Sequence, residues 1–400
     1  MPLELPLHVV GVSHHTAGVR VREHLVLTPD DAAAWLQRQR LAGRSAAILS
    51  TCNRFEIYWS GGDDLEPWFR EFAGARGIDL GTVLTRLDGA AAARHLFSVA
   101  AGLDSQILGE TEILGQVRRA HQTAHTAGTS TRQLDASFCA AIAAGRRVRR
   151  ETALGKHPAS VSSAAVEVAL DALPQGNSAT AVVLGAGEVA DGVMRALVER
   201  GVTRVTLVNR RAERASALAS KWMVRTGAWE DFRALVACAD LLFVTTGAKH
   251  HIVRATDLAD TTAARASELV VLDLAVPRNV EPSARKLPGV RLFNLDDLQQ
   301  LRCPAAGQPS IAVAEAERIL AEELARLEES LRARAAAPQL AELHRLGSEL
   351  AREEADRALA SLDRLSDLER QVVREMAERL VRRVLYPVSR NLRVDDERTA

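Results

Sequence analysis

The sequence has few cysteines, no net charge and no long apolar run, and each shortage excludes a class of protein. Its four cysteines lie far apart and form no CxxC pair, which argues against a disulfide framework or a zinc ribbon. No apolar run approaches the ~20 residues of a membrane-spanning helix, and the N-terminus lacks the features of a signal peptide. We therefore expect a soluble, cytoplasmic protein. Because the formal net charge is zero, a phosphate-rich partner would need a local basic patch.

The chain divides into three segments, since 400 residues is too long for one ordinary core. The first, residues 1–150, has apolar runs at 7–12 and 46–49 that predict two strands. Asp30 is expected to cap a helix between them, and residues 134–150 predict another helix. We expect a small α/β domain with a helical second half.

The second segment, residues 159–301, alternates Val- and Leu-rich runs with helical patterns or polar loops. This alternation predicts a doubly wound parallel sheet with helices on both faces. The predicted strands are residues 181–184, 204–208, 241–245, 269–274 and 291–293.

The third segment, residues 311–400, is almost purely helical in pattern. Leu320, Leu324, Leu327 and Leu331 follow the four-three-four spacing of a coiled-coil seam, and Pro338 is expected to interrupt it. Such a seam needs a partner surface, either on the same chain or on the second subunit of a dimer.

A predicted strand leads into a GxGxxA turn and a helix, which is the required context of a dinucleotide site. Gly185 permits the tight turn, Gly187 lets the backbone approach a pyrophosphate, and Ala190 keeps the helix close to the strand. An accidental glycine-rich turn is the alternative interpretation. The residues expected to contact the cofactor are Gly185, Ala186, Gly187, Glu188, Val189 and Ala190.

The end of the next strand should select the cofactor. There the chain reads Val208-Asn209-Arg210-Arg211, with no carboxylate for the ribose hydroxyls of NAD and two guanidinium groups for a 2′-phosphate. This favours NADPH, contacted by Asn209, Arg210 and Arg211. The alternative is that both arginines simply begin a solvated helix.

Cys52 follows the second predicted strand, within Ser50-Thr51-Cys52-Asn53-Arg54. A thiol at a strand end beside an arginine is placed as a nucleophile, because a nearby cation lowers the thiol pKa. A single cysteine is more often an inert core residue. Beside a hydride donor it has a specific use, since a thioester accepts hydride more readily than other carboxyl derivatives.

Residues 102–116 form a second polar cluster in an otherwise apolar stretch. Polar groups there are costly unless they bind something. Capping could explain Asp104 and Ser105, but it does not explain Glu110, Glu112 and Gln116.

Together these clusters resemble the glutamyl-tRNA reductase family, over essentially the whole chain and in family order. The resemblance implies an N-terminal α/β catalytic domain (1–150), a central Rossmann-type NADPH domain (159–301) and a C-terminal helical dimerisation domain (311–400) in a homodimer. The blocks that carry it are GVSHHTA at 11–17, STCNR at 50–54, GLDS through ILGQV within 102–117, SVSSAAVEVA at 160–169, GAGE at 185–188 and DLAVPRNVEP at 273–282.

By this resemblance, Cys52 attacks the ester of glutamyl-tRNA(Glu), the tRNA leaves, and a thioester remains for hydride from NADPH. The product would be glutamate-1-semialdehyde, in the first step of tetrapyrrole (porphyrin, haem) biosynthesis. His95 matches a histidine important for activity, suited to polarise the carbonyl or protonate the leaving hydroxyl. Arg54 is suited to pair the substrate carboxylate. The positions that match the family's substrate-binding residues are Thr51, Asn53, Arg54, Ser105, Glu110, Thr111, Glu112 and Gln116.

The chain departs from the family pattern at two places. It reads Glu110-Thr111-Glu112 where the family commonly has EPQ, and Thr16-Ala17-Gly18 where the family has TAP. Glu112 adds a carboxylate near an anionic substrate, which should weaken binding unless it faces elsewhere.

Two other functions remain open on the sequence. One is an NADP-dependent dehydrogenase of a small hydroxy acid, comparable to shikimate dehydrogenase, which would need no nucleophilic cysteine. The other is a tRNA-binding or scaffolding protein that keeps NADPH as a structural ligand. A complex with the aminomutase of the next step is implied by the family alone.

Two arginine runs could meet tRNA phosphates, at residues 146–150 and 379–383, although a solvated helix end is the alternative for each. The adjacent pairs His14-His15 and His250-His251 have no third ligand at the usual spacing, so we expect no metal.

Overall fold

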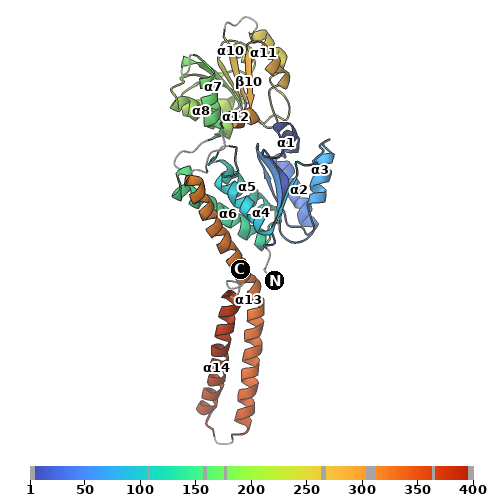
Figure 1. Cartoon of the computed structure of the whole chain (residues 1–400), viewed down its shortest axis with the longest axis vertical. Helices are drawn as coiled ribbons and strands as arrows, with labels where there is room; N and C mark the ends of the chain where they lie inside the picture. The colour runs from blue at the N-terminus through green and yellow to red at the C-terminus, as the bar shows by residue number, and fades with distance from the viewer. Residues whose placement is uncertain are drawn as a thin grey trace. The chain divides into compact units, whose positions relative to one another are not determined.

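The computed structural model describes residues 5–106, 108–110, 112–155, 160–174, 178–262, 267–302, 311–362 and 365–394. Residues 6–323 form one compact unit, and residues 324–400 with the first five residues form another. Figure 1 labels most of the helices of both units, together with β10.

The first of two sheets in residues 6–323 has four antiparallel strands in the order β2-β3-β1-β4. The strands predicted at 7–12 and 46–49 are confirmed, each with a shift of one residue. The sequence does not predict β3 and β4, because Arg54 and Glu56 interrupt the apolar pattern of β3 and β4 is half-exposed. The four strands are β1 (His8–Ser13), β2 (Ala47–Ser50), β3 (Arg54–Trp59) and β4 (Thr85–Asp88).

Helices pack against this sheet, and the helix predicted at 134–150 is confirmed as α6. The prediction that Asp30 caps a helix is wrong, since the cap of α2 is Thr28, whose hydroxyl accepts the Asp31 N–H at 3.2 Å. Pro29 follows as the first helical residue, where its missing N–H has no cost. The helices are α1 (Val19–Leu25), α2 (Pro29–Leu41), α3 (Glu66–Gly74), α4 (Gly89–Ala101), α5 (Glu112–Ala127), α6 (Arg132–Glu151) and the 3-10 turn η1 (Ala153–Gly155).

The second sheet is fully parallel, in the order β10-β9-β8-β5-β6-β7. All five predicted strands are confirmed, with ends that differ by a residue at most. The short, mostly exposed β7 has no apolar run from which it could be predicted. The strands are β5 (Thr180–Leu184), β6 (Arg204–Val208), β7 (Arg225–Gly227), β8 (Leu241–Val244), β9 (Leu269–Asp273) and β10 (Val290–Asn294).

Two apolar clusters, one on each face, confirm the doubly wound arrangement. Alternate strand residues enter each cluster: Val183 and Phe243 face α7, α8, α9 and α12, whereas Val182 and Val244 face α10 and α11. The helices are α7 (Val161–Asp171), α8 (Glu188–Glu199), α9 (Ala212–Trp222), α10 (Phe232–Ala237), α11 (Ala255–Thr262), the 3-10 helix η3 (Pro282–Lys286) and α12 (Leu295–Arg302).

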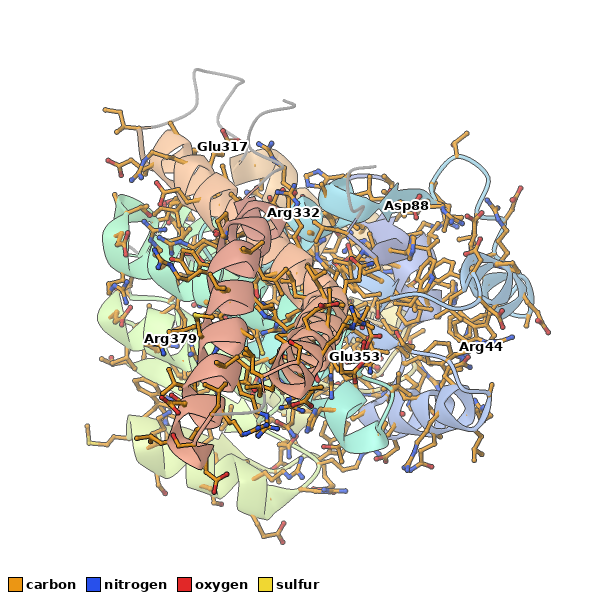
Figure 2. All side chains as sticks on the ribbon, turned by 90° about the horizontal axis from the view of Figure 1, so that it is seen from below. Arg44, Asp88, Glu317, Arg332, Glu353 and Arg379 are labelled. Atoms are coloured by element: carbon orange, nitrogen blue, oxygen red, sulfur yellow. The ribbon has the colours of Figure 1, made fainter. Side chains whose placement is uncertain are left out.

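The helical segment consists of α13 (Ile311–Ala360) and α14 (Asp367–Val394). The expected interruption at Pro338 is wrong, because α13 runs through it; a proline removes one backbone hydrogen bond, which the other turns of a 50-residue helix outweigh. Both helices carry charged side chains such as Glu353 and Arg379 (Figure 2). Among the described residues, none of the helices is long and apolar enough to cross a membrane.

Apolar side chains are buried on one part of this segment and exposed on another. Of the predicted seam, Leu320, Leu327 and Leu331 are buried. On α14, large apolar side chains recur every fourth residue and are about half exposed or more. These are Leu368, Val372, Met376, Leu380 and Val384.

Candidate active site

Cys52 lies in the tight turn that joins β2 to β3. The Thr51 N–H donates to the Arg54 carbonyl at 2.9 Å, and the Thr51 hydroxyl accepts the N–H groups of Asn53 and Arg54, each at 3.1 Å. Asn53 is buried, and its carbonyl accepts the His14 N–H at 2.8 Å. Thr51 and Asn53 therefore shape the loop that presents the thiol.

A buried arginine that the sequence patterns did not single out holds this turn. Arg22 is 2% exposed, donates to the Cys52 carbonyl and forms an ion pair with Asp296 of α12. A signal for it exists in the sequence: Val19, Arg22 and Leu25 share the buried stripe of α1. A cation on such a stripe requires partners from elsewhere in the fold.

The Cys52 thiol lies in a poorly solvated and negatively charged environment. The residue is half-buried and packs against the apolar cluster of the second sheet that faces α7, α8, α9 and α12. Burial raises the pKa of the thiol to about 12, the Glu110 and Glu112 carboxylates act in the same direction, and Arg22 opposes them. The free thiol is therefore protonated near neutral pH.

Arg54 belongs to a buried ion network instead of activating Cys52. Its Nη1 lies 2.7 Å from Glu56 Oε1 and 3.2 Å from Asp104 Oδ2, and its Nη2 donates to the Asp104 carbonyl. The expectation that Arg54 lowers the Cys52 pKa is therefore wrong, because its charge neutralises these two carboxylates. Helix capping by Asp104 is also wrong, since its carboxylate binds Arg54 and lies 2.6 Å from His15 Nε2.

His95 joins the same network from α4. Its Nε2 lies 2.9 Å from Glu56 Oε1, and its Nδ1 lies 3.5 Å from Asp104 Oδ2. Burial lowers the pKa of His95, but the Glu56 carboxylate outweighs burial, so the pKa is raised. A cavity of about 220 Å³ is lined by His95, Glu56, Asp104 and His15, so the His95 imidazole faces an open space.

The polar cluster after Gly102 lies partly at this site. Glu110 is 5% exposed; burial raises its pKa to about 7, against the effect of the Ser105 hydroxyl. The Glu110 carbonyl accepts a hydrogen bond from Arg149 at 2.8 Å. Gln116 is half-buried on α5, and Thr111 lies outside the described residues.

The additional carboxylate of this chain, Glu112, begins α5 at the boundary with the second sheet. Burial raises its pKa, and Glu188 of the GxGxxA turn adds to the effect, while Arg119 and Arg195 oppose it. Glu112 therefore lies near the nucleotide turn as well as near Cys52.

The GxGxxA turn has the shape that a pyrophosphate needs. At Gly185 φ is +126°, and an added Cβ would lie 2.4 Å from Thr245 Oγ1, so only glycine fits. At Gly187, the N-cap of α8, an added Cβ would meet nothing within 4 Å, which leaves the backbone open to a ligand. Ala190 is fully buried in the core. Ala186 and Val189 are half-buried and Glu188 is exposed.

A cavity of about 470 Å³ lies beyond the end of β6. Its lining includes Asn209, Arg210 and Arg211, together with Arg214 and Trp229, which the sequence patterns did not identify. The Arg210 guanidinium lies 5.7 Å from the centre of the Trp229 ring. No described carboxylate forms an ion pair with Arg210, Arg211 or Arg214, so these cations can receive an anionic ligand.

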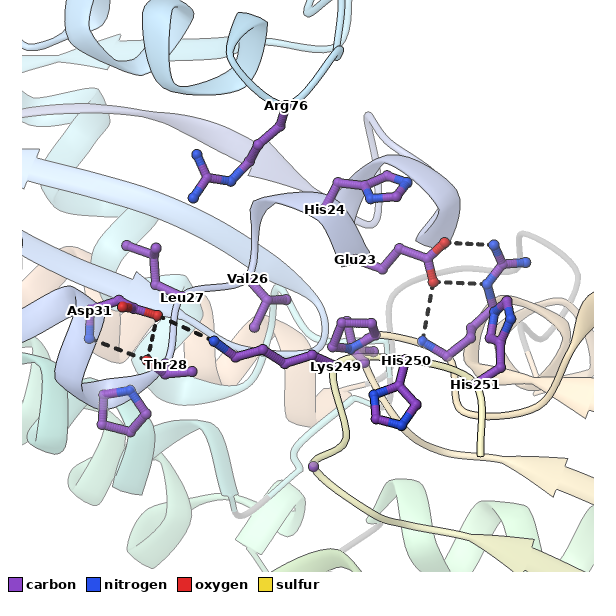
Figure 3. A pocket seen from close by; sticks show the side chains of 15 residues that line it. Glu23, His24, Val26, Leu27, Thr28, Asp31, Arg76, Lys249, His250 and His251 are labelled. Carbon is purple, nitrogen blue, oxygen red and sulfur yellow. Dashed lines mark hydrogen bonds and ion pairs between the residues drawn. The ribbon is translucent and has the colours of Figure 1, made fainter. Parts of the chain in front are cut away.

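A larger cavity, of about 860 Å³, lies between α1–α2 and the loops that follow β8 and β9 (Figure 3). At its wall, Arg278 Nη2 and Nε lie 2.6 and 2.9 Å from the two Glu23 oxygens, and Lys249 Nζ lies 3.7 Å from Asp31. The cavity shares Gly247 and Lys249 with the cavity beyond β6, so ligand space continues along the carboxyl ends of the parallel strands.

Comparisons with known proteins decide the family. The model of the glutamyl-tRNAGlu reductase N-terminal domain matches residues 10–152, and that of the dimerisation domain matches residues 315–400. A glutamyl-tRNA reductase of Deinococcus radiodurans is 41% identical over 74% of this chain and 85% of its own length. That of Thermomicrobium roseum is 35% identical over 100% of this chain and 98% of its own. The chain belongs to the glutamyl-tRNA reductase family.

A solved glutamyl-tRNA reductase of Methanopyrus kandleri is 28% identical and covers 99% of the chain, with a TM-score of 0.47. In the present chain, the shikimate/quinate 5-dehydrogenase family model matches residues 167–301. The likeness to that dehydrogenase thus concerns the parallel-sheet half and a nicotinamide cofactor site, while the half that carries Cys52 matches the reductase model.

The structure places the predicted residues of the reductase in two groups. Cys52, Thr51 and Asn53 form the turn that packs against the second sheet, whereas Arg54 and His95 lie in the buried network around Glu56. Within the described part of the chain, no three His, Cys, Asp or Glu side chains are arranged to hold a metal ion.

Proposed function

We propose that Cys52 carries the glutamyl group as a thioester while the chain, as a member of its family, reduces glutamyl-tRNA to glutamate-1-semialdehyde. This reduction is the first step of tetrapyrrole synthesis. The Cys52 sulfur attacks the ester carbonyl carbon, the bond to the tRNA ribose oxygen breaks, and the released oxygen takes a proton. A reduced nicotinamide held at the GxGxxA turn would supply the hydride; the thioester would then become the aldehyde, and the released thiolate would take a proton to restore the Cys52 thiol.

One observation carries this proposal: the Cys52 turn packs against the second sheet, whose cofactor turn lies at the carboxyl ends of its strands. The group that would hold the acyl carbon and the sheet that would hold the hydride donor are thus adjacent in one compact unit. Adjacency of this kind removes the need to move a reactive intermediate through solvent.

The direct test withholds the cofactor. With glutamyl-tRNA and no nicotinamide, intact-mass and peptide mass spectrometry should detect a glutamyl adduct on Cys52. Cys52→Ser should lack the adduct and lose turnover by ~10³-fold or more. A Cys52→Ser protein that still reduces glutamyl-tRNA at the normal rate would refute the thioester.

NADPH is the proposed cofactor. Gly185 and Gly187 would receive the pyrophosphate, and Arg210, Arg211 and Arg214, which pair with no carboxylate among the described residues, offer cations to a 2′-phosphate. Steady-state kinetics with NADPH and NADH test the preference. Equal kcat/KM for the two cofactors would contradict it.

We assign the remaining predicted residues to the glutamyl group. The Glu56 carboxylate raises the pKa of His95, so this imidazole is suited to polarise the carbonyl or to give a proton to the leaving oxygen. Arg54 would reach a substrate carboxylate only by sharing or exchanging its present partners, Glu56 and Asp104. Thr51, Asn53, Ser105, Glu110, Thr111, Glu112 and Gln116 stay predicted contacts.

The proposed organisation is a catalytic domain at 1–150, a nucleotide domain at 159–301 and a helical dimerisation domain at 311–400. The exposed apolar row of α14 supports a homodimer, because a row of this spacing is stable when a second helix covers it. Light scattering of the full chain tests the dimer. A cytoplasmic location and a complex with the aminomutase that consumes the aldehyde complete the proposal.

For tRNA, the first arginine run is partly occupied. Arg147 pairs with Glu151, Glu322 and Glu323. Arg146 and Arg150 are exposed, and Arg150 also lies 2.8 Å from Glu151, so we propose these two as phosphate contacts. On α14, Arg379, Arg382 and Arg383 are exposed too, and Arg382 lies 3.4 Å from Glu378. The salt dependence of tRNA affinity should fall when either set is neutralised.

A further inference from the structure

We propose that Arg22 is a positioning residue for Cys52, and that Asp296 of the nucleotide-binding half holds Arg22 in place. The position of the thiol then depends on docking of the second sheet's half against the turn. The inference rests on the proposed role of Cys52 as the reacting group, but it concerns how the thiol is held.

Arg22 contacts the backbone and a side chain of the Cys52 turn. Nη1 donates to the Cys52 carbonyl and lies 3.4 Å from Asn53 Oδ1, while Nε donates to the Ala17 carbonyl at 3.0 Å. A guanidinium is planar and its N–H donors point at fixed angles. When two of its nitrogens are held by other partners, the direction of the remaining donor is therefore fixed. Arg22 therefore fixes the carbonyl of the residue that carries the thiol.

Asp296 completes this arrangement from 274 residues further along the chain. Its Oδ1 accepts from Arg22 Nη2, and its Oδ2 accepts the Val19 N–H at 2.7 Å. Val19 is the first residue of α1, the helix that carries Arg22. One carboxylate of the nucleotide-binding half thus holds both the start of α1 and the arginine that reaches Cys52.

The neighbouring residue supplies a matched comparison. Glu23 also lies on α1 and also joins the two halves, through Arg278 with contacts of 2.6 and 2.9 Å (Figure 3). Among the described residues, however, the hydrogen bonds and ion pair of the Glu23 carboxylate go to Arg278, and none goes to residues 51–54. The two pairs differ in whether they reach the Cys52 turn, and this difference separates positioning from simple docking.

The alkylation rate of Cys52 reports on Arg22, because the charged groups around the thiol set its thiolate fraction. Glu110 and Glu112 disfavour the thiolate, and Arg22 is the cation that favours it. With the thiol largely protonated, the alkylation rate follows the small thiolate fraction, so a rise of one pKa unit slows alkylation about tenfold.

The experiment measures iodoacetamide alkylation of Cys52 from pH 7 to 10 by peptide mass spectrometry, in the full chain without substrates. Arg22→Gln should slow alkylation about tenfold, Asp296→Asn should slow it less, and Glu23→Gln should leave it unchanged. Arg22→Lys, which keeps the charge, should restore part of the rate. Exposed Cys139 on α6 serves as the internal control. For turnover, Arg22→Gln should lower kcat more than it raises KM.

Three outcomes would overturn the proposal. In the first, Cys52 is alkylated at the wild-type rate in folded Arg22→Gln and Asp296→Asn. In the second, Glu23→Gln slows alkylation of Cys52 as much as Arg22→Gln does. In the third, Arg22→Gln slows alkylation of Cys139 as much as that of Cys52. If thermal unfolding shows that Arg22→Gln does not fold, the test is the difference in Cys52 alkylation rate between Asp296→Asn and Glu23→Gln. Activity that persists in Cys52→Ser would refute the thioester and leave the alkylation result intact, so the two failures are distinguishable.

Discussion

The two sheets of residues 6–323 carry their sites in opposite ways. Around the antiparallel sheet, charged side chains are buried and paired, with Arg54 1% and Glu56 3% exposed. Along the parallel sheet, the site consists of a backbone turn and exposed arginines such as Arg210 and Arg211. Removing one member of a buried pair leaves an uncompensated charge, whereas an exposed charge is already solvated. Charge removal should therefore cost stability in the first site and ligand affinity in the second.

The largest effect is expected for Glu56→Gln. This change leaves Arg54 and His95 without their shared carboxylate, so the free energy of unfolding should fall by about 3 kcal/mol. Urea denaturation measures it. Arg210→Gln, a charge removal in the second site, should stay within about 0.5 kcal/mol of wild type. Similar losses of unfolding free energy in both variants would contradict the predicted difference between the two sites.

The same carboxylate predicts a pH dependence of stability. Burial raises the pKa of Glu56, but Arg54 outweighs burial and lowers the value from 4.5 to about 2. Below pH 4.5 the unfolded chain binds more protons than the folded one, so this contribution is complete above pH 4.5 and is lost toward pH 2. Unfolding followed from pH 6 to 2 should show a shallower decline in Glu56→Gln. Parallel curves would rule out the assigned pairing.

The two sites also differ in how far the sequence predicts them. The nucleotide turn is local: strand, Gly185, Gly187 and helix follow one another, so spacing alone predicts the residues that we propose to contact the cofactor. The five longer strands of that sheet can also be predicted, because both faces of the sheet are covered and the strands are therefore apolar runs.

The antiparallel site is assembled from distant positions. Arg54 meets Asp104 50 residues further on, and Arg22 meets Asp296 across 274. A pattern of residue types identifies Cys52 and Arg54 as polar residues after a strand, but it cannot assign the partners that neutralise a charge. For this reason the expected activation of the thiol by Arg54 is wrong, and the sequence patterns do not identify Arg22.

The next largest effects are expected for two glycine variants, which distinguish a loss of stability from a loss of cofactor binding. Gly185→Ala puts a Cβ 2.4 Å from Thr245 Oγ1 at positive φ, so it should cost about 1–3 kcal/mol of stability and weaken NADPH binding. Gly187→Ala meets nothing within 4 Å, so it should fold normally and still weaken binding, because the methyl group occupies the space of the pyrophosphate. Calorimetric unfolding and NADPH titration test both. Normal NADPH affinity in Gly187→Ala would show that the pyrophosphate lies elsewhere.

Smaller changes are expected from the exposed arginines. Arg210→Gln and Arg211→Gln should each raise KM for NADPH about tenfold, the value of one charge-assisted hydrogen bond, and leave KM for NADH unchanged. Arg204→Gln is the matched control, because Arg204 is exposed at the opposite end of β6. A parallel loss with both cofactors would indicate a general defect of the sheet, not recognition of a 2′-phosphate.

The smallest effect is expected for Glu112, which lies near both the Cys52 thiol and the nucleotide turn. Glu112 acts on Cys52 and is itself acted on by Glu188 of the nucleotide turn. Glu112→Gln removes one carboxylate that disfavours the thiolate, so Cys52 alkylation should be a few-fold faster. Glu188→Gln should not change it, since Glu188 acts on Glu112 and not on the thiol. Combined with Arg22→Gln, which slows alkylation, Glu112→Gln should return the rate toward wild type if the two charges act independently. A double variant as slow as Arg22→Gln alone would mean that Arg22 governs the thiol through its position and not through its charge.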